Sequence, residues 1–423
     1  MNNFDVKSYI RNFHKVREQT INLCKPLAVE DFVAQPIVDV SPPKWHLAHT
    51  TWFFEALVLE NFSDNYQVFD KYYSFLFNSY YNTVGDRVQR PNRGNMTRPT
   101  VEEIIKYREY VDEKVVEFLS IKETEIDKSL AYILELGIQH EQQHQELLVT
   151  DFKYILGMNP LFPPYKDFLG KETKSVDSTG KYISIEEGIY EIGYTGDQFC
   201  FDNELARHKV YLNPFQYMNR LSTNKEFLEF IDDGGYSRFN LWLSEGWDWV
   251  KEHDIHAPMY WHKMDNKWYH YTLSGLEEVN LNDPVTHISY FEADAFASWK
   301  GKRLLTEEEW EVVCKMKEPN PGIKSNFVES ENFRPLQVVD NLQQLMGDVW
   351  EWTGSAYLSY PNFKKSEGAI GEYNGKFMIN QMVLRGGSCA TPREHIRPTY
   401  RNFFHPHLRW QFTGIRLAES LTK

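Results

Sequence analysis

The sequence predicts a multidomain protein, with an N-terminal bundle of four helices followed by an irregular α+β domain. Residues 1–158 contain few glycines and several segments with a hydrophobic period of 3.6 residues, which is typical of packed helices. From residue 181 to 423, Gly, Trp, Asn and Asp are more frequent, and short strand-like segments alternate with turns. The segment 159–180, rich in Pro, Gly and Lys, is the expected linker.

Two of the expected helices in the first part have recognisable starts. Ser41 is a candidate N-cap, and the two prolines that follow it suit a first helical turn. Thr100 and Glu103 have the spacing of a capping box. The expected helices cover about residues 4–27, a segment that starts after residue 43, about 101–121 and about 126–156.

The second part is expected to mix short strands with helices. Strand-like segments lie at 182–186, 188–192 and 383–385. Residues 289–300 have the apolar spacing of an amphipathic helix, and a capping box at 306–309 begins another helix. The many turns between these segments indicate an irregular domain.

Composition and charge exclude several classes of protein. The chain has 423 residues and a formal net charge of −14, which argues against nucleic-acid binding because phosphates require a basic surface. The four cysteines are scattered, so neither a disulfide framework nor a cysteine zinc site is expected. No apolar run reaches the ~18 residues of a membrane span. The charged segment MNNFDVKSYIRNF does not have the pattern of a signal peptide, so we expect a cytoplasmic protein.

Two histidines in the fourth expected helix form a candidate metal site. His140 and His144, in the motif HEQQH, are one helical turn apart, so both imidazoles lie on one face and can reach one ion. This face should point into the bundle because it continues a largely apolar stripe. The stripe consists of Leu130, Ile133, Gly137, His140, His144, Leu147 and Leu148.

The second expected helix contributes a third histidine. His49 lies on a mostly aromatic stripe and should also face inward, whereas His46 lies one position around the helix and is expected to be a hydrogen-bonded core residue. Together with His140 and His144, His49 could surround one ion. Three neutral imidazoles leave coordination positions open, which suits a catalytic metal.

The motif HEQQH also matches the HExxH pattern of zinc metalloproteases, in which Glu141 would be the general base. Such enzymes usually take a third ligand downstream of the motif. Here the next histidine is His208, beyond the expected domain boundary. His49 therefore fits a three-histidine site better, and a zinc hydrolase is the main alternative from the residues alone.

Several segments together resemble the sulfoxide synthases of ergothioneine biosynthesis, over nearly the whole chain. These segments are HLAHTTWFFE, HEQQHQELL, PVTHISYFEADAFASWKGKRLLTEEEWE, GDVWEWTGSAY, RGGSCATP and RNFFHPHLRWQFTGIRLA. The resemblance implies a DinB-like four-helix bundle over 1–158. It also implies a C-type-lectin-like domain of the formylglycine-generating-enzyme type over 181–423.

By this resemblance, His49, His140 and His144 bind iron(II), and dioxygen is a co-substrate. The implied reaction joins the thiol of cysteine to the imidazole ring of hercynine (trimethylhistidine) and oxidises the sulfur, giving hercynylcysteine sulfoxide. A formylglycine-generating activity is not implied. That enzyme uses two active-site cysteines near the C-terminus, and here only Cys389 lies in that region.

The long connection at about 62–99 is expected to cover a functional site, because long ordered loops are often functional. Its residues Tyr80 and Tyr81 are similar to the tyrosine pair of the family branch that uses free cysteine, where a tyrosine supplies a proton or hydrogen atom during oxygen activation. Arg87 and Arg90 are the expected ligands of the cysteine carboxylate, since guanidinium groups bind carboxylates bidentately. Alternatively, the arginines of this basic loop are solvated and bind no substrate.

Further substrate contacts follow from the resemblance. Gln143 would bond to the hercynine imidazole, and Asn402, Phe403 and Phe404 would line the site of its trimethylammonium and carboxylate groups. Aromatic faces do attract quaternary ammonium ions. The branch that uses γ-glutamylcysteine has Asn-Trp-Asp at this place, so the loss of the acid favours free cysteine as the thiol donor.

Two other readings stay open. A related synthase could act on histidine itself or join a selenium-carrying sugar to hercynine. Alternatively, the bundle could bind a metal without turnover, because DinB-like bundles are not all catalytic.

Overall fold

The computed structural model describes residues 5–79, 81, 85–122, 126–166, 179–320, 325–337, 343–365, 371 and 374–421. The chain forms two compact units. Unit 1 comprises Met1–Lys166 with the short segments Asp197–Phe199 and Glu367–Glu372, and unit 2 comprises the rest. None of the described helices is long and apolar enough to cross a membrane.

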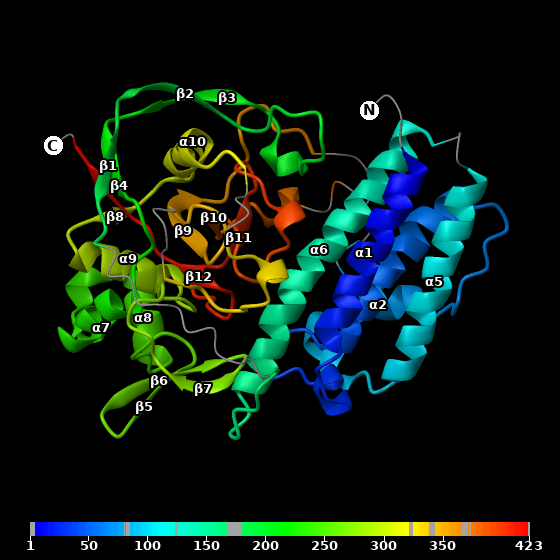
Figure 1. Cartoon of the computed structure of the whole chain (residues 1–423), viewed down its shortest axis with the longest axis horizontal. Coiled ribbons are helices and arrows are strands. Elements are labelled where there is room, and N and C mark those ends of the chain that lie inside the picture. Colours follow the sequence, from blue (N-terminus) through cyan, green and yellow to red (C-terminus); the bar gives the residue numbers. More distant parts are fainter. Residues whose placement is uncertain are drawn as a thin grey trace. The chain divides into compact units, whose positions relative to one another are not determined.

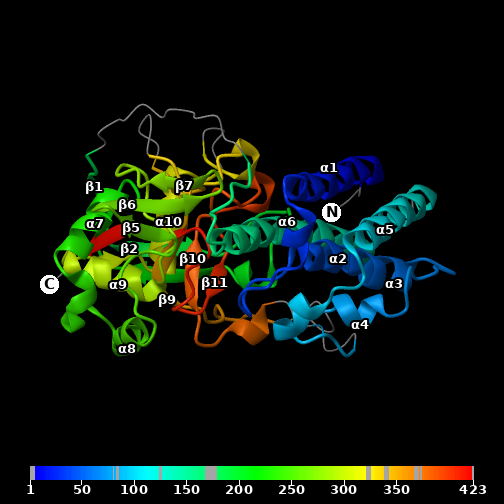
Figure 2. The same ribbon diagram turned by 90° about the horizontal axis from the view of Figure 1, so that it is seen from below.

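Unit 1 is built on four helices that lie side by side in both views (Figures 1 and 2). They are α1 (Val6–Cys24), α2 (Pro43–Phe54), α5 (Val101–Ile121) and α6 (Lys128–Gly157). The capping box of α5 is present, since the Thr100 hydroxyl accepts from the Glu103 amide and the Glu103 carboxylate accepts from the Thr100 amide. The expected four-helix bundle is therefore confirmed, with helix bounds that differ by a few residues.

The expected cap of α2 is wrong. Pro42, and not Ser41, is the N-cap residue, and it makes no side-chain cap hydrogen bond. The amide of Ser41 instead donates to Oδ2 of Asp151 on α6, over 2.8 Å. A tertiary contact between two helices has replaced the local cap, which the sequence pattern around Ser41 could not show.

Helix α2 is buried on all sides, because every residue of Pro43–Phe54 is buried. It packs against α5 and α6, and its outer side is covered by η1 (Val29–Val33) and α4 (Tyr73–Phe77). A Cβ atom at Gly137 would lie 2.5 Å from the Phe54 ring, so glycine at this position allows α6 to approach α2 closely.

The connection between α2 and α5 is largely ordered. It begins with a π-helical turn, η2 (Glu55–Leu59), and continues through α3 (Glu60–Phe62), α4 and the 3-10 helix η3 (Arg90–Asn95). Glu55 anchors it, since its carboxylate accepts from the Tyr66 hydroxyl (2.8 Å) and the Phe69 amide (3.0 Å). The same carboxylate accepts from the Tyr107 hydroxyl of α5 (2.6 Å), so the connection is fixed to the bundle.

Unit 2 is an irregular α+β domain, as expected. In the part that the structure describes, its strands form sheets of order β1-β4-β13-β8, β11-β10-β9-β12, β5-β6-β7 and β2-β3. The strands are β1 (Tyr182–Ile185), β2 (Gly188–Ile192), β3 (His208–Leu212), β4 (Phe215–Met218), β5 (Trp261–Met264), β6 (Lys267–Thr272), β7 (Gly275–Glu278), β8 (Arg303–Leu304), β9 (Trp350–Ala356), β10 (Met382–Arg385), β11 (Asn402–Phe404), β12 (Thr413–Gly414) and β13 (Leu417–Ser420). The helices are α7 (Asn224–Asp232), α8 (Ser244–Glu252), α9 (Tyr290–Trp299) and α10 (Glu307–Lys317).

A buried ionic network fixes the segment that leads into β11. Glu307, at the start of α10, pairs with Arg385 of β10 (2.9 Å) and with Arg401, the residue before β11 (2.8 Å). All three side chains are almost fully excluded from solvent. Because an unpaired buried charge is costly, the network specifies how α10 and these strands pack together. Glu307 and Arg385 thus have a structural role within unit 2.

Candidate metal centre

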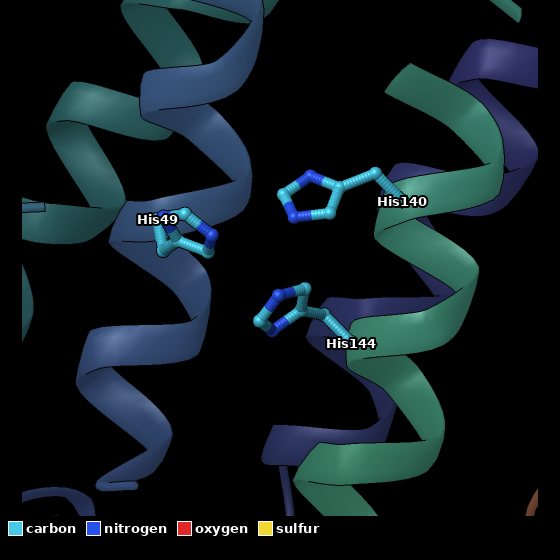
Figure 3. A group of neighbouring side chains, drawn as sticks. All are labelled: His49, His140 and His144. Atoms are coloured by element: carbon cyan, nitrogen blue, oxygen red, sulfur yellow. The ribbon is translucent and has the colours of Figure 1, made fainter. Parts of the chain in front are cut away.

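Three histidines converge inside unit 1. His49 on α2 and His140 and His144 on α6 direct their rings toward one another (Figure 3). All three are buried, and one nitrogen from each lies within 4.8 Å of the nitrogens of the other two. This is the only group of its kind found among the described His, Cys, Asp and Glu residues. Two histidines one turn apart on α6 and one on the facing helix therefore form a site that could hold one metal ion.

Hydrogen bonds determine which ring nitrogen faces the centre. Nδ1 of His49 donates to the backbone carbonyl of Phe77 over 2.6 Å, and Nδ1 of His144 lies 2.8 Å from Nδ1 of His46. In both histidines Nε2 is left for an ion. Nε2 of His49 is fully buried and has no hydrogen-bond partner among the described residues. A metal ion would satisfy this nitrogen, so the residues fit the metal that the sequence predicts.

The three imidazoles are held in the neutral form. Burial lowers the pKa of His49 and of His144 well below 6.5, and the neighbouring His140 lowers both further. Burial also lowers the pKa of His140, to about 3. A neutral imidazole keeps the lone pair that a metal requires, so the site is ready to bind an ion at neutral pH.

Aromatic rings fix the orientation of His49. Trp45 and Trp52, four residues before and three residues after it on α2, both stack on its ring, with centroid distances of 4.5 and 5.5 Å. The guanidinium of Arg93 lies over the ring of Trp45, 3.4 Å from its centroid. The aromatic stripe on α2 thus serves to hold the histidine and to keep water out.

Glu141, the second residue of HEQQH, points away from the histidines and into a buried ionic cluster. Its carboxylate accepts from Arg17 of α1 (2.8 Å), from Arg108 of α5 (2.5 Å) and from Thr20 (2.6 Å). Burial by itself would raise its pKa, but Arg108 and Arg17 outweigh this effect and lower the pKa to about 2. A carboxylate with both oxygens occupied by three donors is poorly suited to act as the general base of a zinc hydrolase.

The tyrosines expected in the covering loop are placed in part. Tyr81 is buried, and its ring lies 5.6 Å from that of Trp52, which stacks on His49. The side-chain amide of Asn78 donates to the carbonyls of Tyr81 and Gly85. Tyr80 lies outside the described residues.

The arginines of the same connection differ in their surroundings. Arg90 is exposed and donates to the backbone carbonyls of Val38 and Asp39. Arg87 is half-buried. Arg93 is the buried one, and besides covering Trp45 it donates to the hydroxyls of Ser41 and Ser79. Sequence reasoning preferred Arg87 and Arg90. The stacking of Arg93 could not be inferred, because Trp45 is distant in sequence.

Comparison with known proteins fits this architecture. The family model described as "DinB superfamily" matches residues 12–148. The model described as "Sulfatase-modifying factor enzyme 1-like domain" matches residues 168–335 and 337–421. The hercynine oxygenase of Mycolicibacterium thermoresistibile is 30% identical over 310 residues, which cover 66% of this chain and 67% of that protein. That of Mycobacterium tuberculosis is 30% identical over 313 residues, covering 68% and 71% of the two chains. The chain belongs to the hercynine oxygenase family. Ergothioneine biosynthesis protein 1 of Schizosaccharomyces pombe is 27% identical over 64% of this chain and 33% of its own length.

Membership of the hercynine oxygenase family makes this chain an oxygenase of the ergothioneine-pathway type, with a DinB-like part and a C-type-lectin-like part.

The expected substrate residues lie on two elements. Gln143 is half-buried on α6, directly before His144. Asn402, Phe403 and Phe404 form β11 of unit 2, all half-buried. The Phe403 ring stacks on Tyr357 with centroids 4.0 Å apart. The substrate roles of these four residues stay predictions.

Two residues beside the site were not predicted to act there. His46 bonds to His144 through one ring nitrogen, and its other ring nitrogen lies 3.0 Å from Oδ2 of Asp151. Asp151 is seven residues after His144, which is two helical turns, and therefore lies on the same face of α6. This spacing was a signal in the sequence that could have identified it.

Proposed function

We propose that the protein is an iron(II)- and dioxygen-dependent sulfoxide synthase that joins cysteine to hercynine. The convergence of His49, His140 and His144 as neutral, buried imidazoles supports this proposal most strongly. The reaction takes the imidazole C–H of hercynine, the S–H of cysteine and one dioxygen, and yields a C–S bond, a sulfoxide oxygen and one water. Dioxygen accepts four electrons, two from C–S bond formation and two from oxidation of the sulfur.

The residues of the chain would share this chemistry as follows. The three histidines hold the metal and leave coordination positions for both substrates. When bound, iron(II) supplies the activation of dioxygen. Trp45 and Trp52 stack on the buried ring of His49 and keep it in place. Tyr81 is buried, with its ring next to that of Trp52, and is the candidate proton donor together with Tyr80.

The substrate side of the proposal rests on charge and ring faces. Hercynine carries a trimethylammonium group, for which Phe403 and Phe404 offer aromatic faces and Asn402 a side-chain dipole. Both substrates carry a carboxylate, and Arg87 and Arg90 are the candidate ligands in the covering connection. Free cysteine is the proposed donor, because Phe404 occupies the place of the acid found in the branch that uses γ-glutamylcysteine.

The alternative of a zinc hydrolase is less well supported. It needs Glu141 as a base near the metal, whereas the Glu141 carboxylate is bound by Arg17 and Arg108 away from the histidines. A synthase acting on histidine or on a selenium-carrying sugar would use the same metal centre. Only its substrates would distinguish it from the proposed enzyme.

The deciding experiment is an anaerobic reconstitution with iron(II), followed by addition of hercynine with cysteine or with γ-glutamylcysteine. After admission of air, products are followed by mass spectrometry and oxygen consumption by an electrode. We expect hercynylcysteine sulfoxide from free cysteine. If neither thiol is coupled and oxygen is not consumed, the proposal fails for these substrates. Histidine and the selenium-carrying sugar are then the next substrates to test.

A further inference from the structure

A chain of hydrogen bonds runs from a buried carboxylate to one of the three histidines. Oδ2 of Asp151 lies 3.0 Å from Nε2 of His46, and Nδ1 of His46 lies 2.8 Å from Nδ1 of His144. All three side chains are at least nine-tenths buried. His46 does not belong to the group of converging nitrogens, because both of its ring nitrogens are already engaged.

The chemistry of these groups determines where the protons lie when His46 is neutral. A carboxylate only accepts, so Nε2 of His46 carries the hydrogen that faces Asp151. The other nitrogen of His46 is then an acceptor, and the Nδ1 of His144 that faces it must be the donor. A neutral His144 with its hydrogen on Nδ1 presents the lone pair of Nε2 to the centre.

The carboxylate is itself held in place. Oδ2 of Asp151 also accepts from the amide of Ser41, two residues before α2 begins, over 2.8 Å. The same helix carries His46 and His49, so this contact ties the start of α2 to the α6 face that carries His144. For His49 the corresponding acceptor is the backbone carbonyl of Phe77, which substitution cannot remove. Of these two histidines, His144 is therefore the one whose hydrogen-bond partner at Nδ1 is an exchangeable side chain.

We infer that His46 and Asp151 are positioning residues of the metal centre, which fix the tautomer and ring orientation of His144 and thereby raise its affinity for the metal. This inference rests on the proposed metal-dependent function. Removing partners of this kind usually weakens metal binding about 10- to 100-fold. A purely structural role would lower the stability of the metal-free protein and leave the metal affinity unchanged.

The test uses Co(II) as a probe with the full-length protein under anaerobic conditions. Its visible absorption reports on the coordination, and a titration gives the dissociation constant. His46→Leu removes both hydrogen bonds at similar volume. His46→Asn returns an amide oxygen near the position of Nδ1, where it can accept from His144. The matched control is His395→Leu, a buried histidine of unit 2 that bonds to the Tyr400 hydroxyl over 3.1 Å.

We expect His46→Leu to weaken Co(II) binding about 10- to 100-fold and to change the absorption spectrum. His46→Asn should recover part of the affinity, and His395→Leu should bind Co(II) as tightly as the wild type. Wild-type affinity and spectrum in His46→Leu would overturn the inference. If that variant does not fold, Asp151→Ala decides, since it removes the oxygen that faces Nε2 of His46 and must still weaken binding. A wild-type protein that does not bind Co(II) would instead overturn the metal centre, and with it both proposals.

Discussion

The guanidinium of Arg93 lies 3.4 Å from the ring centroid of Trp45, and Trp45 stacks in turn on His49. Arg93 is buried, and its positive charge contributes to the lowered pKa of His49 and of His144, after burial and the charge of His140. This stack connects the covering loop to the histidines through side chains alone. It makes Arg93 the arginine of that loop whose loss should matter most to the centre.

We therefore expect Arg93→Met to lower kcat/KM for sulfoxide formation by about 10-fold or more, since the buried cation that stacks on Trp45 and donates to Ser41 and Ser79 is lost. Steady-state kinetics with both substrates would measure the effect. Arg98→Met is the matched control, because Arg98 is exposed and, among the described residues, donates only to the neighbouring Thr97 carbonyl. Equal activities of the two variants would show that the stack on Trp45 has no part in catalysis.

Glu141 predicts a defined dependence of stability on pH. Its folded pKa of about 2 lies below the value of about 4.3 in an unfolded chain. Its contribution to stability is therefore fully present above about pH 4.5 and is lost as the pH falls toward 2, and the difference corresponds to about 3 kcal/mol. In Glu141→Gln, urea unfolding should show lower stability at pH 7 and a weaker fall between pH 4.5 and about 2.5.

The same variant tests the hydrolase alternative. Because the Glu141 carboxylate is bound by Arg17 and Arg108, its replacement should act through stability, with coupling activity retained by the protein that folds.

The pH prediction has its own contradicting outcome. If the free energy of unfolding falls by the same amount in wild type and in Glu141→Gln across the acid range, this pH dependence does not belong to Glu141.

Metal binding should stabilise the fold through the three histidines. A ligand present at 100 times its dissociation constant stabilises a protein by about 2.7 kcal/mol. Anaerobic addition of Fe(II) should therefore raise the Tm of the wild type and leave the Tm of His49→Ala and His140→Ala unchanged. Differential scanning fluorimetry would measure both. His208→Ala, which removes the next histidine after the HEQQH motif, should respond to Fe(II) as the wild type does.

Tyr81 is expected to steer the products. Its ring is buried next to Trp52, and removal of its hydroxyl in Tyr81→Phe should shift turnover from sulfoxide formation toward oxidation of cysteine alone. Mass spectrometry of both products gives their ratio. Tyr9→Phe is the control, a buried tyrosine of α1 that donates to the Leu134 carbonyl. A product ratio that stays the same in Tyr81→Phe and in the double variant with Tyr80→Phe would remove this loop from the mechanism.

Local patterns sufficed for much of the fold. The capping boxes at Thr100 and Thr306 begin α5 and α10 as expected, because their hydrogen bonds join residues three positions apart. Ser41 failed as a cap because its amide found a partner on a distant helix. The inward direction of His49 also came from a stripe on α2, yet the helix is buried all round. Burial alone would therefore not have singled out the face that carries the site.

The sequence by itself determined that His140 and His144 share one helical face, since the pitch of a helix sets the direction of residues four apart. It also indicated the family, through segments spread over both parts of the chain. Only the tertiary structure decided that Glu141 turns away to Arg17 and Arg108, and that Asp151 reaches His144 through His46. Those contacts join helices far apart in sequence, and the packing of α1, α2 and α5 around α6 fixes them.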